Sequence, residues 1–117
     1  MRYILLIYSR ETDWTGLSDE AKGEMIGQYR AFTESIKKSG NYLAGDGLEP
    51  TATATTVRLR NGKTITTDGP FAETREQLGG YYVIRAKDLD EASAIAARVP
   101  GAAVGSIEVR PIMETGA

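Results

Sequence analysis

Apolar and polar residues along this chain follow two kinds of pattern, one typical of strands and one of helices. Residues 2–8 (RYILLIY) and 79–85 (GGYYVIR) are apolar at both odd and even positions. Such runs predict strands that are covered on both faces of a sheet. Residues 41–48 and 105–110 show shorter strand patterns. We expect these four segments to form one antiparallel sheet.

Two further segments have the apolar spacing of amphipathic helices. The first is expected to begin after Ser18, a favourable N-cap, and to end at Gly40. The second is expected to begin after Asp88, with Glu91 at capping-box spacing, and to end before Pro100. The apolar stripe of the first helix is Met25, Tyr29, Phe32 and Ile36. The expected buried face of the second is Leu89, Ala92, Ile95, Ala96 and Val99.

A hairpin is predicted in the middle of the chain. The dipeptide Asn61-Gly62 joins residues 55–60 to residues 63–67, and Asn-Gly between two strand patterns is a strong signal for a two-residue turn. Apolar and polar residues alternate in both runs, so we expect the hairpin to have one apolar face and one solvent-exposed (wet) face. The expected apolar face consists of Val57, Leu59 and Ile65, and the wet face of Arg58, Arg60 and Thr66.

The order of elements is β-α-β, an inserted hairpin, and β-α-β. This order predicts the α+β class, as a ferredoxin-like sandwich with an antiparallel sheet and two helices on one face. Because strands 2–8 and 79–85 are apolar on both sides, the other face needs a cover. A homodimer that pairs two sheets face to face would supply it. The length of 117 residues fits a single domain, 1–117.

The amino-acid composition excludes several kinds of catalytic group and binding partner. It has no cysteine and no histidine, which excludes disulfides, thiol nucleophiles and the usual general base near neutral pH. We find no metal or cofactor motif and expect none. The formal net charge is −2 and no segment is strongly basic, so no nucleic-acid partner is expected. The apolar run at residues 3–8 is too short to span a bilayer, so no membrane association and a cytoplasmic location are expected.

One segment carries a family signature. Residues 68–74 (DGPFAET), continued by residues 76–81 (EQLGGY), resemble the motif of the DGPF branch of the YCII-related family. Further matches at residues 1–8, 52–57 and 109–111 extend the resemblance over nearly the whole chain. The resemblance implies a dimeric α+β barrel built on a ferredoxin-like unit.

The resemblance implies little about activity. Most members are bacterial proteins without an assigned reaction, and genes of this branch often lie near those of extracytoplasmic-function sigma factors, which makes a sigma factor a candidate partner. Some relatives in the wider family are dehydrochlorinases that resemble enzymes with a His–Asp pair. This chain has no histidine, so that pair cannot be carried over.

The candidate catalytic residues are Asp68 and Glu73, carboxylates in the loop before strand 79–85. The alternative is structural, with Asp68 shaping a turn and the acidic loop simply solvated. The candidate ligand-binding residues are Tyr29, Phe71 and Tyr81, for which the alternative is packing in the core. Trp14, in the loop before the first helix, is either a lid over the pocket or a packing residue.

Three functions remain open on the sequence alone. The preferred one is a small-molecule-binding homodimer, with a regulatory role as one option, whose pocket lies between the sheet and the first helix near Asp68. The second is an enzyme that uses Asp68 or Glu73 as base and Tyr29 as hydrogen-bond donor. The third is a protein-interaction module, with the hairpin or the acidic loop contacting a sigma factor. The first is preferred because it needs no potent catalytic group.

Overall fold

The central sheet is antiparallel and has the strand order β2-β5-β1-β6. The computed structural model describes residues 1–114. The strands of this sheet are β1 (Arg2–Ser9), β2 (Tyr42–Gly47), β5 (Gln77–Arg85) and β6 (Ser106–Pro111). They lie within two residues of the predicted segments, so the predicted α+β class with an antiparallel sheet is confirmed.

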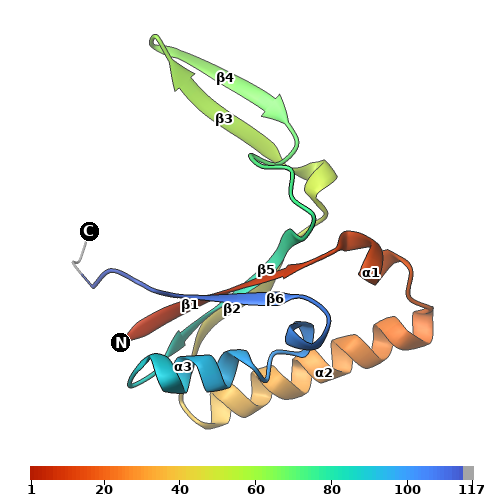
Figure 1. Ribbon diagram of the computed structural model, residues 1–117, viewed down its shortest axis with the longest axis vertical. Coiled ribbons are helices and arrows are strands. Elements are labelled where there is room, and N and C mark those ends of the chain that lie inside the picture. The colour runs from red at the N-terminus through yellow and green to blue at the C-terminus, as the bar shows by residue number, and fades with distance from the viewer. Residues whose placement is uncertain (115–117) are drawn as a thin grey trace.

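Helices α2 (Asp19–Lys38) and α3 (Leu89–Ala96) lie on one side of the sheet (Figure 1). Both predicted N-caps are confirmed. The Ser18 hydroxyl accepts a hydrogen bond from the Ala21 N–H at 3.1 Å, and Asp88 Oδ1 accepts one from the Glu91 N–H at 2.9 Å. Single helical turns, which the sequence pattern did not predict, occur at α1 (Glu11–Thr15), η1 (Thr51–Thr53) and η2 (Pro100–Ala103).

The core lies between the sheet and these helices. Alternate residues of β1 point into it, so Tyr3, Leu5 and Ile7 are buried while Ile4 and Leu6 are only half-buried. The rest of the core consists of Phe32, Ile36, Tyr82, Ile84, Ala86, Ala92, Ile95, Ala96 and Val99. The prediction that Leu89 belongs to the buried face is wrong, because α3 begins at this residue and core contacts start one turn later; its side chain is 54% exposed.

The other side of the sheet has no helix over it within residues 1–114 (Figure 1). Cross-strand pairing places Ile4 opposite Val83 and Leu6 opposite Tyr81. Residues directly opposite each other in a sheet share a face. We call this side, formed by Ile4, Leu6, Tyr8, Tyr81 and Val83, the open face. It is the second apolar face that the sequence pattern predicted.

Strands β3 (Thr55–Arg60) and β4 (Lys63–Asp68) form a separate hairpin that projects from the body (Figure 1). Asn61 and Gly62 both have positive φ, 52° and 75°, as a type I′ turn requires. The expected single wet face is wrong. Arg58 pairs with Ile65, so Ile65 shares a face with the arginine, whereas Val57 and Leu59 lie on the other face and are 63% and 66% exposed.

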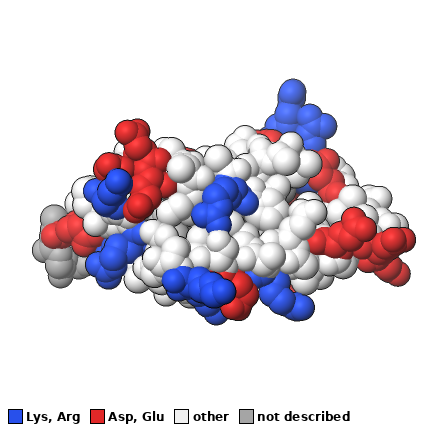
Figure 2. Space-filling view, turned by 90° about the horizontal axis from the view of Figure 1, so that it is seen from below, with Lys and Arg blue, Asp and Glu red and all other residues white. Residues whose placement is uncertain are grey.

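The surface on the α2/α3 side carries both signs of charge. Figure 2 shows Lys and Arg interspersed there with Asp and Glu, without an extended patch of one sign. No helix within the described part of the chain has the length and apolar character needed to cross a membrane.

Candidate functional site

A cleft of about 790 Å³ lies between α2 and the sheet. Strands β2 and β5 form one wall, α2 another, and α1 with the segment 47–50 closes the end. Its lining includes Trp14, Tyr29, Thr33, Tyr42, Leu48 and Tyr82. The sequence predicted a pocket between the sheet and the first long helix, and the cleft is in this position.

Two glycines allow the aromatic walls of the cleft to approach the backbone. A Cβ atom at Gly45 would lie 2.5 Å from Cδ1 of Tyr82, and one at Gly101 would lie 2.6 Å from the Tyr29 hydroxyl. Both distances are shorter than any van der Waals contact. The Tyr82 ring is further fixed by an edge-to-face contact with Phe32, with ring centroids 5.2 Å apart. The shape of the cleft therefore depends on glycine at both positions.

Some hydroxyl groups of the cleft have protons that are not used in hydrogen bonds within the chain. The Tyr29 hydroxyl accepts a hydrogen bond from the Gly101 N–H at 3.1 Å, which leaves its own proton for another acceptor. Thr33 and Tyr82 share one hydrogen bond of 2.8 Å, which uses one of their two protons. Burial raises the pKa of Tyr29 and of Tyr82, so both remain protonated at neutral pH. The cleft thus offers hydrogen-bond donors to a ligand.

The charged groups that border the cleft are all acidic, namely Glu11, Asp46 and Glu49. Glu11 Oε1 accepts a hydrogen bond from the Thr51 N–H at 2.9 Å, and hydrogen bonding with Thr51 lowers the pKa of Glu11. Tyr81 donates to Asp46 Oδ2 at 3.1 Å, and this bond raises the pKa of Tyr81. Because these carboxylates are not balanced by a lining Lys or Arg, the cleft is unfavourable for an anionic ligand.

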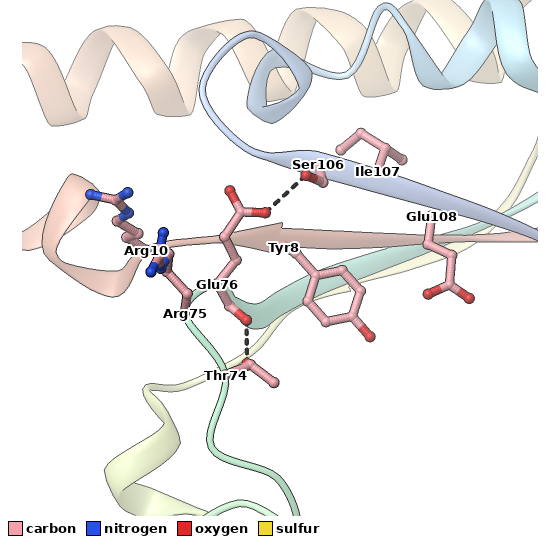
Figure 3. A pocket seen from close by; sticks show the side chains of 8 residues that line it. All are labelled: Tyr8, Arg10, Thr74, Arg75, Glu76, Ser106, Ile107 and Glu108. Carbon is pink, nitrogen blue, oxygen red and sulfur yellow. Dashed lines mark hydrogen bonds between the residues drawn. The ribbon is translucent and has the colours of Figure 1, made fainter.

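A second cavity of about 520 Å³, which we call the hollow, lies where β1 and β6 meet the segment 74–76 (Figure 3). Ser106 Oγ donates to Glu76 Oε1 at 2.8 Å, and Thr74 Oγ1 donates to the Glu76 carbonyl, so β6 and the segment are tied together. The residues lining the hollow are Tyr8, Arg10, Thr74, Arg75, Glu76, Ser106, Ile107 and Glu108. None of them lines the cleft.

Of the residues predicted to bind a ligand, Tyr29 and Tyr81 border the cleft. Tyr82 contacts α2, so the alternation of the strand turns the Tyr81 side chain toward the open face. Phe71 lines neither cavity and is 81% exposed. The structure therefore places the Tyr29 side chain in the cleft, turns the Tyr81 side chain toward the open face at the border of the cleft, and leaves Phe71 outside it.

The candidate catalytic residues also lie outside both cavities. Asp68 is the last residue of β4 in the projecting hairpin, and both Asp68 and Glu73 are exposed. The expectation that the pocket lies near Asp68 is wrong, because Asp68 pairs with Thr55 at the base of the hairpin and lines neither cavity. The turn that follows is held by backbone contacts of Gly69, whose φ of 102° favours glycine. The catalytic roles of Asp68 and Glu73 stay predictions.

Sequence reasoning did not find Thr33, Glu11 or Gly101. Thr33 lies one helical turn after Tyr29, and this spacing of two hydroxyl side chains was a signal that could have been used. Glu11 and Gly101 have no such signal, because their neighbours in the cleft are distant in the sequence. Among residues 1–114, no group of three or more Asp, Glu, His or Cys side chains is placed to hold a metal ion.

Comparisons with known proteins agree with this architecture. A solved structure with a TM-score of 0.57 is the 5-chloro-2-hydroxyhydroquinone dehydrochlorinase TftG from Burkholderia phenoliruptrix AC1100, in complex with 2,5-dihydroxybenzoquinone. The match covers 99% of this chain and 97% of TftG at 13% identity, which shows a shared fold. An uncharacterised protein of Rhizobium meliloti (strain 1021) is 38% identical over 114 residues, covering 96% of this chain and 92% of the relative. The model of the YCII-related domain matches residues 1–115, and the chain therefore belongs to the YCII-related family.

Proposed function

We propose that this protein is a small-molecule-binding homodimer whose ligand occupies the cleft between the sheet and α2. The observation that carries the proposal is the cleft itself. Its volume of about 790 Å³ falls within the range of ligand pockets, and its walls combine aromatic rings with a few hydroxyl groups. Binding without turnover suits a chain that lacks both histidine and cysteine.

The lining of the cleft favours an uncharged ligand that carries hydrogen-bond acceptors. Tyr29 and the Thr33–Tyr82 pair have protons to donate, whereas the bordering carboxylates disfavour an anion. The rings of Trp14, Tyr29 and Tyr82 favour a flat molecule. TftG, which shares the fold, was solved with 2,5-dihydroxybenzoquinone, whose acidic hydroxyl groups are ionised at neutral pH, so it supports only the size and flatness of the proposed ligand. A small hydroxylated or carbonyl-bearing ring is therefore the ligand class that we propose.

The proposal is tested by titrating the full-length protein with a panel of small uncharged rings, namely hydroquinone, catechol and benzamide, and with 2,5-dihydroxybenzoquinone as an anionic comparison. Binding is measured by amide chemical shifts and by calorimetry, with the fluorescence of Trp14, the single tryptophan, as a local reporter. We expect saturable binding by at least one compound, with shifts around Tyr29 and Gly45.

Tyr29→Phe removes a donor from the cleft and should weaken binding by about three- to tenfold, corresponding to one hydrogen bond. Tyr8→Phe is the matched control, since it removes a hydroxyl from the hollow and should leave cleft binding unchanged. If the whole panel fails to saturate the protein, or if both variants weaken binding equally, the cleft is not the ligand site.

We further propose that the chain belongs to the DGPF-motif branch and that its ferredoxin-like sheet pairs with a second copy. Residues 68–74 support the branch, and the strand order β2-β5-β1-β6 with two long helices on one face supports the ferredoxin-like topology. The open face supports the dimer, because Ile4, Leu6 and Val83 form an apolar surface that a second sheet would cover.

A further inference from the structure

The hollow contains two arginines that have no acidic partner within residues 1–114. Arg10 and Arg75 both line it, and in Figure 3 their guanidinium groups lie at the same end. The side-chain ion pairs of the described residues use other arginines, Arg2 with Glu114 and Arg110 with Glu108. Two positive charges therefore line one cavity, and neither is held in an ion pair within residues 1–114.

Two acidic residues, Glu76 and Glu108, also line the hollow, and each has a partner other than Arg10 and Arg75. Glu76 Oε1 accepts a hydrogen bond from Ser106 Oγ at 2.8 Å, and Glu108 is paired with Arg110. Neither carboxylate lies within ion-pair distance of Arg10 or Arg75. The donors of both guanidinium groups thus remain available to a ligand.

The side chain of Gln77 holds the two arginine-bearing segments together. Its Oε1 accepts a hydrogen bond from the Glu11 N–H at 3.1 Å, directly after Arg10, and its Nε2 donates to the Thr74 carbonyl at 2.7 Å, directly before Arg75. The backbone beside both arginines is therefore held by a clamp, the Gln77 side chain, that does not involve their charges, while the two arginine side chains are exposed. Like charges held close together repel each other, and an anion between them removes that cost.

We propose that the hollow is a second ligand site, which binds a small molecule through a carboxylate or phosphate group held by Arg10 and Arg75. Guanidinium groups present paired N–H donors that match the oxygens of both anions. The Tyr8 ring borders the site and gives the rest of the ligand an apolar wall. This inference does not rest on ligand binding in the cleft, because the hollow and the cleft share no lining residue. The hollow adjoins the open face through Tyr8, so a second copy paired with that face would lie beside the site.

The test is a titration of the full-length protein with inorganic phosphate and, separately, with succinate, at low ionic strength and followed by amide chemical shifts. We expect saturable shifts at Arg10, Arg75 and Ser106. Arg10→Gln or Arg75→Gln should weaken binding about tenfold, as expected for one charge-assisted hydrogen bond. Arg30→Gln is the matched control, because it makes the same change in net charge on the exposed surface of α2.

Gln77→Leu tests the positioning role of the clamp. It should lower the affinity several-fold although both arginines remain, while the unfolding temperature, measured in parallel, reports whether the fold is intact. Saturation by phosphate alone or by succinate alone identifies which anion the site prefers. Shifts that stay linear with both probes, or equal weakening by Arg30→Gln and Arg10→Gln, would overturn the proposal.

Discussion

The two faces of the sheet are built from the same strands but differ in cover and in chemistry. One face lies under α2 and α3, buries Tyr3, Leu5 and Ile7 and borders the cleft, where all the charged groups are acidic. The open face leaves Leu6 half-buried, and the hollow at its end is lined by two arginines and two glutamates. The difference teaches that packing against α2 and α3 determines the structure of the covered face. The environment of the open face depends instead on whether a second copy or a ligand binds to it.

The largest expected difference is in the free energy of unfolding, between substitutions at two neighbouring residues of β5 that lie on opposite faces of the sheet. Ile84 is fully buried, and Ile84→Ala should lower the free energy of unfolding by about 2–5 kcal/mol, because it leaves a cavity in the core. Val83→Ala, on the open face, should cost about 1 kcal/mol or less in the isolated chain. Chemical denaturation at low protein concentration measures both. Equal losses would show that the open face is packed as tightly as the core.

The next largest effect concerns assembly. If the open face pairs with a second copy, Leu6→Glu places an unpaired charge in the interface and should raise the dimer dissociation constant by about a hundredfold or more. Leu89→Glu is the matched control, because Leu89 is exposed on α3, on the other side of the sheet. Sedimentation across a concentration series distinguishes them. A wild-type protein that stays monomeric at micromolar concentration would contradict the dimer.

A smaller effect is expected at the start of α3 on the covered face. Asp88→Ala removes the acceptor for the Glu91 N–H and should lower the free energy of unfolding by about 1 kcal/mol. Asp90→Ala, at the second residue of the same helix, changes the charge equally without removing this bond and should cost less. Thermal or chemical unfolding gives the comparison. An equal loss in both variants would show that charge at the helix start, and not the cap, stabilises α3.

The smallest expected effect is a decrease in the free energy of unfolding at alkaline pH. Burial raises the pKa of Tyr29 above its value in the unfolded chain, about 10, so the folded state retains the proton longer than the unfolded state. The free energy of unfolding should therefore fall as the pH rises above about 10. In Tyr29→Phe this fall should be less steep than in the wild type, because one of the tyrosines responsible is absent. Identical slopes would show that Tyr29 titrates normally.

Much of the fold could be predicted from the sequence because the signals are local. Ser18 and Asp88 cap the helices that follow them, and the parity of apolar residues in β1 predicted two apolar faces. The wrong assignment of Ile65 was avoidable. A two-residue turn fixes the register, so counting outward from Asn61-Gly62 places Ile65 opposite Arg58.

The candidate sites were decided by contacts between segments far apart in the sequence. Tyr29 meets Gly101 across 72 positions, and Gln77 bonds to Glu11 across 66. Periodicity, capping and turn signals act over a few neighbouring residues and cannot show which distant segments will meet. The sequence by itself therefore determined helices α2 and α3, the strands and the two apolar faces. Only the tertiary structure placed the cleft and the hollow, and moved Asp68 away from both, because these depend on how the segments pack together.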